Sequence, residues 1–476
     1  MTQLGPLERT DPAVRVSADA VVVIPGIMGS RLVEAATGRV LWGLGRAAQL
    51  AARWRHREGL AALAVTPQER DGRVGRVVPA GLLDTAEFAP VLRGIEPYGR
   101  LVRRLREVLV HPDALLEFGY DWRLSVEHNA EQLAAELRAH LAAWRAHPAR
   151  PPGVEPRVVL VAHSMGGLVA TAMCARHPDL AAEVRATVTL GTPFLGAVKA
   201  AALLNSGHGT PLEHRNLLAL ARTLPGVHDL LPAYRCVVTA DEDVVELGAA
   251  EAAALGADPE LFERTRRTRA LLDPSVLPNH RAVVGAGQPT EQALRIEAGV
   301  VRTYHHGHLR HPDDELVRDA IGRLVPVDHT GDGTVFRYSA TPHDGVDEIC
   351  LGQTHGALAK SSTALDVVCG VVTRLPARSA LGGELPEDTV GLRLPDLVTA
   401  GEPFTVAVDG VRDAGAASCL VEDAHVDGAP VARPLLARGD RPDVLVASVV
   451  LDEPGLYRVA VSGGADPVTE LVLVQE

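Results

Sequence analysis

The chain has 476 residues, of which 46% are hydrophobic, and its formal net charge is −13 at pH 7. This length is typical of two domains, and the acidic balance argues against a nucleic-acid-binding protein, which needs a basic face for phosphates. The five cysteines are scattered without a C-x-x-C pair, so neither a disulfide framework nor a zinc site is indicated.

The N-terminal residues 1–19 contain several charged side chains and no apolar segment of the kind found in secretory signals. No stretch of the chain approaches the roughly 20 apolar residues of a membrane-spanning helix. The sequence therefore predicts a cytoplasmic protein with reduced cysteines.

Short apolar runs alternate with helical patterns up to about residue 375. Residues 20–24, 157–162 and 185–190 are rich in β-branched side chains and apolar almost throughout, which predicts buried strands. Such alternation favours a mostly parallel sheet with helices on both faces.

A helix is predicted between the first two of these strands. Asn129 is a suitable N-cap, and His147-Pro148 marks the end of the helical pattern. The residues that fall on its apolar face are Leu133, Leu137, Leu141 and Trp144.

The second predicted strand runs directly into His163-Ser164-Met165-Gly166-Gly167. A strand followed at once by a helix indicates a sharp turn that exposes the hydroxyl of Ser164 as a nucleophile. Ala162 stands where the usual pattern has glycine. The N–H of Met165, at the helix start, is a candidate donor to an oxyanion. The alternative interpretation is a serine that only caps a helix.

Asp332 is the predicted acid of a catalytic triad. In α/β-hydrolases the acid follows the serine and precedes the histidine, and glycines on both sides of Asp332 allow a tight loop that points at an imidazole. The alternative is an ordinary Asp-Gly turn. Asp328 is the nearest rival, and Asp344 is a weaker one.

His355 is the predicted base, 23 residues after Asp332, where small polar residues precede it and a helix-like run follows. The histidine takes the proton of the serine, and the acid fixes its tautomer. Among 19 histidines His343 is the main competitor. His163 is excluded, because its side chain leaves the turn beside the serine rather than opposite it.

A second group of histidines, His305, His306 and His308 with His311, suggests a metal site. No carboxylate or cysteine accompanies it, and the local pattern is typical of an exposed hairpin. We therefore predict neither a metal nor another cofactor.

Residues 373–395 are rich in proline and glycine and lack periodicity, as an interdomain linker would. The predicted organisation is a catalytic domain (1–375), a linker (376–390) that few contacts cross, and an immunoglobulin-like β-sandwich (391–476). The sandwich is predicted from strands at 404–408, 444–451, 456–461 and 471–474. The turn before Tyr457 resembles a tyrosine corner.

Five sequence blocks resemble the lecithin:cholesterol acyltransferase and lysosomal phospholipase A2 family of α/β-hydrolases. The blocks are Val21–Ser30, Phe118–Leu124, His163–Gly167, Leu190–Phe194 and Gly331–Val335. The Tyr-Asp-Trp-Arg run in the second block is the most specific, and its charges, Asp121 and Arg123, are interpreted as an internal ion pair. The sandwich lies outside the resemblance.

The resemblance implies acyl transfer through a serine acyl-enzyme, with a lipid ester as substrate and water or an alcohol as acceptor. It also implies that the loop after the first strand supplies the second oxyanion donor, at Ile27. Secreted members of the family have a signal and a lid disulfide, which this chain lacks. A lid is expected within residues 44–101 or 203–228.

The predicted function is a phospholipase-like hydrolase or acyltransferase, acting on a lipid or other ester at a membrane surface. Two alternatives remain open: a small-ester or lactone hydrolase, and a catalytically silent hydrolase fold used for binding. The sandwich is expected to affect where the enzyme acts, through a membrane or a protein partner, and not to be needed for hydrolysis of a soluble ester.

Overall fold

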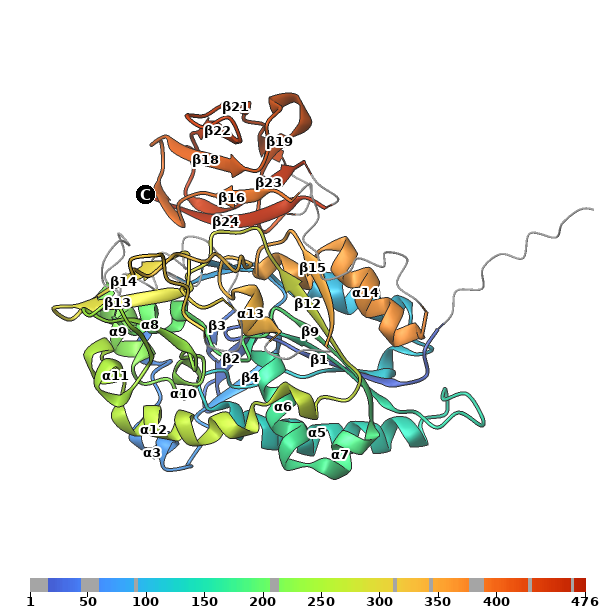
Figure 1. Ribbon diagram of the computed structural model, residues 1–476. Helices are drawn as coiled ribbons and strands as arrows, with labels where there is room; N and C mark the ends of the chain where they lie inside the picture. Colours follow the sequence, from blue (N-terminus) through green and yellow to red (C-terminus); the bar gives the residue numbers. More distant parts are fainter. Residues whose placement is uncertain are drawn as a thin grey trace, which may run out of the picture.

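A six-stranded sheet forms the centre of the molecule (Figure 1). The computed structural model describes residues 16–43, 60–89, 93–205, 214–310, 315–341, 346–375, 389–426, 430–463 and 466–476. In spatial order the strands are β15 (Asp347–Leu351), β12 (His280–Gly285), β9 (Val184–Leu190), β8 (Val158–His163), β1 (Ala20–Ile24) and β7 (Leu115–Glu117). All neighbouring pairs are parallel. The three predicted strands are β1, β8 and β9, and the predicted α/β-hydrolase fold is confirmed.

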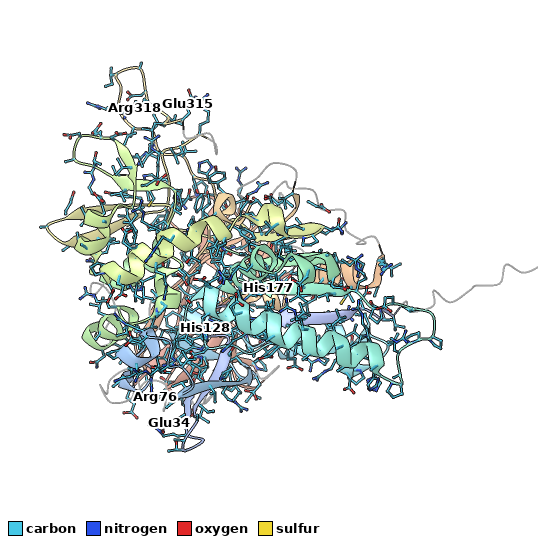
Figure 2. All side chains as sticks on the ribbon, turned by 90° about the horizontal axis from the view of Figure 1, so that it is seen from below. Glu34, Arg76, His128, His177, Glu315 and Arg318 are labelled. Atoms are coloured by element: carbon cyan, nitrogen blue, oxygen red, sulfur yellow. The ribbon has the colours of Figure 1, made fainter. Side chains whose placement is uncertain are left out.

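Helices cover both faces of this sheet (Figure 1). On one face lie α5 (Val126–Ala146), α6 (Met165–Arg176) and α7 (Pro178–Glu183), and on the other α4 (Gly99–Glu107) and α14 (Ser362–Thr373). Seen from below (Figure 2), His128 of α5 and His177, which ends α6, lie on the first of these layers. Among the described helices, none has both the length and the apolar character required to cross a bilayer.

Helix α5 begins earlier than predicted. Its N-cap is Ser125, whose Oγ accepts a hydrogen bond from the His128 N–H at 3.1 Å. Asn129 is instead buried in the first turn, where its Nδ2 donates to the carbonyl of Asp121 at 3.0 Å. The predicted apolar face is confirmed, since Leu133, Leu137, Leu141 and Trp144 are all buried.

Two insertions stand beside the sheet. The first, between β1 and β7, contains β2 (Ser30–Glu34), β3 (Val40–Trp42), α3 (Pro67–Arg70), β4 (Val77–Leu82), β5 (Glu87–Ala89), β6 (Arg93–Ile95) and α4. The second, between β9 and β12, contains α8 (Val198–Asn205), α9 (His214–Ala221), α10 (Pro225–His228), β10 (Arg235–Val238), β11 (Val244–Glu246), α11 (Ala249–Leu255) and α12 (Pro259–Thr268). After β12, β13 (Ala293–Glu297) and β14 (Val300–Tyr304) join β10 and β11 in a four-stranded sheet. Of the predicted lid ranges, residues 44–59, 90–92 and 206–213 lie outside the described residues.

The C-terminal part contains two sheets around a core of its own. One sheet has the order β16 (Gly391–Arg393), β18 (Phe404–Asp409), β22 (Val444–Val449), β21 (Ala437–Arg438). The other has the order β17 (Leu397–Thr399), β24 (Val468–Gln475), β23 (Gly455–Ser462), β19 (Ser418–Asp423), β20 (Pro430–Ala432). The Tyr457 hydroxyl donates to the carbonyl of Glu453 at 2.9 Å, as a tyrosine corner does. The four predicted strands correspond to β18, β22, β23 and β24.

Strand β24 lies at the border between this sandwich and the catalytic unit (Figure 1). Its side chains alternate: Val472 and Val474 belong to the core of the sandwich, whereas Leu471 and Leu473 belong to the core of the catalytic unit. A strand that is buried on both faces ties the two parts together. The expectation that few contacts cross the boundary is therefore wrong.

Candidate active site

Ser164 stands in the sharp turn between β8 and α6. Its backbone has φ 52° and ψ −127°, a strained conformation for a residue with a side chain. The turn requires glycine at the two positions that follow Met165, Gly166 and Gly167. A Cβ on Gly166 would lie 2.4 Å from the carbonyl oxygens of Ile24 and Pro25, and one on Gly167 would lie 2.0 Å from Thr192 Oγ1. The small residues in the motif therefore let strand and helix approach closely.

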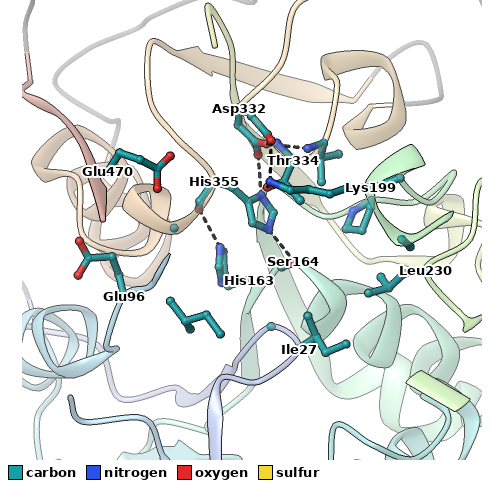
Figure 3. Close-up of a pocket in the computed structure, with 18 of the residues that line it drawn as sticks. Ile27, Glu96, His163, Ser164, Lys199, Leu230, Asp332, Thr334, His355 and Glu470 are labelled. Atoms are coloured by element: carbon teal, nitrogen blue, oxygen red, sulfur yellow. Dashed lines mark hydrogen bonds and ion pairs between the residues drawn. The ribbon is translucent and has the colours of Figure 1, made fainter. Parts of the chain in front are cut away.

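The structure brings the three predicted residues together (Figure 3). His355 Nε2 lies 2.8 Å from Ser164 Oγ, and His355 Nδ1 lies 2.7 Å from Asp332 Oδ2. The carboxylate accepts a hydrogen bond from Nδ1–H, so Nε2 has a free lone pair that accepts a hydrogen bond from the serine hydroxyl. Asp332 is 2% exposed and Ser164 is 6% exposed, so bulk water screens this relay only weakly.

A tight loop fixes Asp332. Its second carboxylate oxygen, Oδ1, accepts the N–H groups of Thr334 at 2.9 Å and Val335 at 2.7 Å. Gly333, with φ +88°, adopts a conformation that side chains disfavour. Gly191 leaves room for the acid–base pair, because a Cβ there would lie 2.9 Å from Asp332 Oδ2 and 3.1 Å from His355 Nδ1.

Asp328, the nearest rival for the role of the acid, bonds to other residues than His355. Asp328 accepts hydrogen bonds from Gln292 Nε2 at 2.6 Å and from the Thr330 N–H at 2.8 Å. His343 and Asp344, the other rivals, lie outside the described residues.

The two predicted oxyanion donors flank the serine. Met165 is the first residue of α6, so its N–H has no partner within the helix. Ile27 lines the cavity at Ser164, in the turn after β1. Gly26 lets that turn approach, because a Cβ there would lie 2.8 Å from Ser164 Cβ. Among the described residues, neither the Ile27 nor the Met165 N–H donates to a protein acceptor.

A hydrogen-bonded chain connects the Ile27 turn with the catalytic histidine. The Gly26 N–H donates to the Tyr98 hydroxyl at 2.9 Å, and that hydroxyl lies 2.7 Å from His163 Nδ1. His163 Nε2 lies 3.0 Å from the carbonyl of His355, which can only accept. Nε2 of His163 therefore carries the proton, and Tyr98 donates to Nδ1.

His163 is neutral in this chain. Burial, together with the nearby His355 imidazole, lowers the pKa of His163 to about 3. Its side chain lies beside the serine and bonds to the main chain of His355. This position agrees with the prediction that His163 is not the base.

The Tyr-Asp-Trp-Arg block supports the turn that contains Ile27 through hydrogen bonds to its main chain. The Tyr120 hydroxyl donates to the carbonyl of Pro25 at 2.8 Å, and Trp122 Nε1 donates to the carbonyl of Ser30 at 3.1 Å. The predicted ion pair is present, with Arg123 Nη2 2.7 Å from Asp121 Oδ2.

A third member of this ion cluster was not predicted. Arg123 Nη2 also lies 2.9 Å from Glu69 Oε1. Burial alone would raise the pKa of Glu69, but hydrogen bonds from Arg123 and the Thr66 N–H outweigh it and lower the pKa to about 2.

A cavity opens at Ser164, and His355 and Asp332 also line it. Its lining is largely apolar on the side of Ile27 and Leu230 (Figure 3). Lys199 of α8 lies on the side of Asp332, where its Nζ donates to the carbonyl of Gly333 at 3.1 Å. Glu96 and Glu470 stand on the opposite side.

Among the described residues, His305, His306 and His308 do not form a group whose ligand atoms lie close enough to share a metal ion. The group with ligand atoms close enough to share an ion is instead His111, Asp113 and His147, with His111 and His147 partly buried and Asp113 exposed. In both of its histidines Nδ1 accepts a backbone N–H, at 3.2 Å in His111 and 3.1 Å in His147. The neutral ring then carries its proton on Nε2, so binding a metal would require each ring to change tautomer or to give up this hydrogen bond.

Residues 73–255 match the model of a family described as lecithin:cholesterol acyltransferase. This part of the chain is therefore similar to that family. The match confirms the family resemblance and includes three of the five sequence blocks, Phe118–Leu124, His163–Gly167 and Leu190–Phe194. It supports an enzyme that acts on lipid esters as a hydrolase or acyltransferase. No curated protein is significantly similar to the chain.

Two solved structures show a distant likeness. A chain of the Tle4–Tli4 complex has 16% identity and a TM-score of 0.49, with 75% of this chain and 99% of that chain covered. The Bacillus licheniformis lipase BlEst2 in its propeptide form has 12% identity and a TM-score of 0.34, with 98% and 95% covered. The fold assignment rests on the parallel sheet and its helices, not on these scores.

Several residues at the site were not predicted from the sequence, among them Tyr98, Gly191 and Lys199. Tyr98 and Lys199 carry no local signal, since their partners Gly26, His163 and Gly333 lie far away in the chain. Gly191 belongs to the Leu190–Phe194 block of the family resemblance, and that block was the one signal that could have indicated it.

Proposed function

We propose that the protein is a serine-dependent lipid acyl-ester hydrolase or acyltransferase that works through an acyl-enzyme on Ser164. The observation that carries this proposal is the continuous relay from Asp332 through His355 to Ser164, with hydrogen bonds of 2.7 and 2.8 Å. Nucleophile, base and orienting acid are all within hydrogen-bonding reach before any substrate binds.

In the first half-reaction, Ser164 Oγ attacks the carbonyl carbon of the ester while His355 Nε2 takes the hydroxyl proton. The carbonyl π electrons move to oxygen, where the N–H groups of Ile27 and Met165 are placed to stabilise the negative charge. The tetrahedral intermediate then collapses, the bond to the leaving alkoxide breaks, and His355 returns the proton to it. The products are an alcohol and the acyl-enzyme.

In the second half-reaction, water or an alcohol takes the place of the leaving group. His355 removes a proton from this acceptor while the acceptor oxygen attacks the acyl carbon. His355 then protonates Ser164 Oγ as the bond between Oγ and the acyl carbon breaks. Asp332 stabilises the imidazolium that forms in both halves. Water yields a carboxylic acid, and an alcohol yields a new ester.

The cavity wall favours an acyl chain in the substrate. Ile27 and Leu230 present apolar surface near Ser164 (Figure 3), and burying a methylene group there contributes about 0.8 kcal/mol. The family match supports a lipid ester as substrate. We assign this chemistry to residues 1–375, joined through a linker at 376–390 to the sandwich at 391–476.

Covalent labelling by a fluorophosphonate tests the proposal. We expect the wild-type protein to be labelled at Ser164, and Ser164→Ala to abolish both labelling and ester hydrolysis, with a loss on the order of 10⁴ to 10⁶ in rate. The variant should keep the circular dichroism spectrum of the wild type. Labelling that persists at another serine, such as Ser30, would contradict the assignment.

A panel of substrates then resolves the substrate class. Phosphatidylcholine vesicles, a short-chain p-nitrophenyl ester and a lactone are compared with the wild-type enzyme. Turnover of vesicle lipids above that of the other two supports a lipid acyl hydrolase. Turnover of only the small ester or the lactone would favour the alternative hydrolase, and no turnover of any with no labelling would indicate a silent fold.

A further inference from the structure

The loop that carries the catalytic histidine rests directly on the C-terminal sandwich. Thr354 and Gln353, the two residues before His355, are 4% and 3% exposed. Thr354 Oγ1 donates to the carbonyl of Thr469 at 2.6 Å, and Gln353 Nε2 donates to the carbonyl of Pro467 at 3.1 Å. Both acceptors are backbone groups at the beginning of β24, so the strand itself is the support.

The segment that follows His355 is held by the same part of the sandwich. Asp466 Oδ2 accepts the Ser361 hydroxyl at 2.8 Å and the Thr363 N–H at 2.9 Å. The short helical turn Gly356–Ala359 lies between these two anchor points. Contacts from the sandwich thus bracket His355 on both sides along the chain.

The loop of Asp332 has a similar support. Gln288 is 4% exposed, and its N–H donates to the carbonyl of Gly331 at 2.9 Å. Its side chain reaches into the sandwich, where Nε2 donates to the carbonyl of Val390 at 2.8 Å and Oε1 accepts the Leu392 N–H at 2.9 Å. The acid and the base of the triad are therefore both tethered to the sandwich, while Ser164 is not.

A buried ion cluster fastens the same border. Arg458 of β23 binds both carboxylate oxygens of Glu96, at 2.8 Å each, and Lys360 Nζ lies 2.9 Å from Glu96 Oε1. Burial alone would raise the pKa of Glu96, but the hydrogen bonds from Arg458 and the charge of Lys360 outweigh it and lower the pKa. The cluster joins the first insertion, the segment after His355 and the sandwich.

We propose that the C-terminal sandwich positions the acid–base pair of the triad, with Thr354 and Gln288 as its positioning residues. This inference rests on the proposed function, because it concerns the alignment of His355 with Ser164. The histidine must present Nε2 to the serine and Nδ1 to Asp332 at once, and a displacement of about 1 Å can cost roughly 100-fold in rate. The sandwich limits that displacement through hydrogen bonds to its main chain.

The test compares Thr354→Val with Thr354→Ser in the full-length protein. Valine keeps the shape of threonine but cannot donate to Thr469, whereas serine keeps the hydroxyl. With a soluble p-nitrophenyl ester we expect Thr354→Val to lower kcat and the rate of Ser164 labelling by roughly ten-fold, with KM nearly unchanged. Thr354→Ser should keep most of the wild-type kcat and labelling rate.

Thr268→Val is the matched control. Thr268 is also buried and donates to a main-chain carbonyl, that of Arg264 at 3.1 Å, but it lies on α12 and does not line the site. The Thr268→Val variant should unfold at a lower temperature than the wild type, with kcat unchanged. If Thr354→Val behaves like this control, or if Thr354→Ser is as slow as Thr354→Val, the proposal is wrong.

A second variant covers the case in which Thr354→Val does not fold. Gln288→Met removes both side-chain bonds to the sandwich and should lower kcat in the same way, with KM nearly unchanged. Wild-type turnover from Gln288→Met would overturn the proposal.

A spectroscopic readout separates this inference from the proposed function. The proton that His355 Nδ1 donates to Asp332 should give a low-field signal in the ¹H NMR spectrum. We expect Thr354→Val to shift or broaden that signal, whereas Thr268→Val should not. Absence of labelling at Ser164 in the wild type would refute the proposed function alone, while an unchanged signal in Thr354→Val would refute the positioning role.

Discussion

The nucleophile turn and the loop of His355 meet at two hydrogen bonds, Ser164 Oγ to His355 Nε2 and His163 Nε2 to the carbonyl of His355, but different parts of the chain hold them. The conformation of Ser164 is set by its neighbours in sequence, the strand β8 and the helix α6, while Gly166 and Gly167 let that helix pack closely against Ile24, Pro25 and Thr192. His355 is fixed by residues more than a hundred positions away, such as Thr469, which accepts the bond from Thr354.

This difference separates a locally encoded half of the site from a half that depends on tertiary contacts. A local element keeps its geometry wherever its sequence folds, because strand, turn and helix determine one another. A loop anchored by distant segments keeps its geometry only while those segments stay docked. Substitutions in the two halves should therefore differ in what they affect.

Next to the loss of Ser164 itself, the largest effects are expected from the loops that carry the acid and the base. His355→Ala and Asp332→Asn should each lower kcat/KM by at least roughly 10³-fold, because the serine loses its base or the base loses its tautomer. The rivals provide the controls: Asp328→Asn and His343→Ala should stay near the wild-type value. Steady-state kinetics on a short-chain ester gives the ranking, and the reverse order within either pair would transfer the role to the rival.

The next effect concerns the local half. Gly166→Ala places a Cβ 2.4 Å from the carbonyl oxygens of Ile24 and Pro25, so the turn must move. We expect kcat to fall by roughly 100-fold, since Ser164 and the Met165 N–H shift together. Gly99→Ala is the control, because a Cβ at Gly99 meets no atom within 4 Å. Wild-type turnover from Gly166→Ala would show that the turn tolerates displacement.

The same division explains what the sequence could predict. The fold, the apolar face of α5, the nucleophile turn and the Asp121–Arg123 pair were predictable because each signal lies within a few neighbouring residues. Asp332 and His355 were singled out by chain order and flanking glycines, and the structure brings both to Ser164. Asn129 was mistaken for a cap because Ser125, the actual cap, precedes the apolar pattern.

The contact between sandwich and catalytic unit could not be predicted in this way. Leu471 and Leu473 alternate with Val472 and Val474 in a strand whose two faces are both buried. An uninterrupted apolar run predicts a buried strand but does not say which surface lies on each side. The composition of residues 373–395 predicts a linker, but a linker does not determine whether the parts that it joins are docked.

A smaller effect on kcat is expected from the hydrogen-bonded chain that connects the Ile27 turn, through Tyr98 and His163, with the main chain of His355. Tyr98→Phe removes the hydroxyl between the Gly26 N–H and His163 Nδ1 and leaves two buried polar groups without partners. The free energy of unfolding should fall by about 1–3 kcal/mol, and kcat should fall several-fold because the Ile27 turn and the main chain of His355 both lose support.

Tyr234→Phe is the control for Tyr98→Phe. It also removes a buried hydroxyl, which donates to the carbonyl of Gln292 at 3.0 Å away from Ser164. Denaturant unfolding and ester kinetics together distinguish the two variants. Equal kcat in both would mean that the chain from Gly26 to His355 is only structural.

The smallest effect on turnover is expected from Glu69→Gln, which changes stability instead. The carboxylate is buried and bound to Arg123. Its folded pKa of about 2 is below the ordinary value of 4.5, so the folded state favours the charged form. The charge therefore stabilises the fold fully above about pH 5, and this contribution is lost as the pH falls towards 2.

The loss in Glu69→Gln should be about 1.5–3 kcal/mol near neutral pH, the value of a hydrogen bond to a charged group. Unfolding by denaturant at pH 7 and at pH 4 measures the difference between variant and wild type, and this difference should be smaller at the lower pH. Glu402→Gln, at an exposed position of the sandwich, should show no such difference. A gap that stayed constant or widened on acidification would contradict the lowered pKa, because a group that prefers its charge in the folded state must lose that advantage when it is protonated.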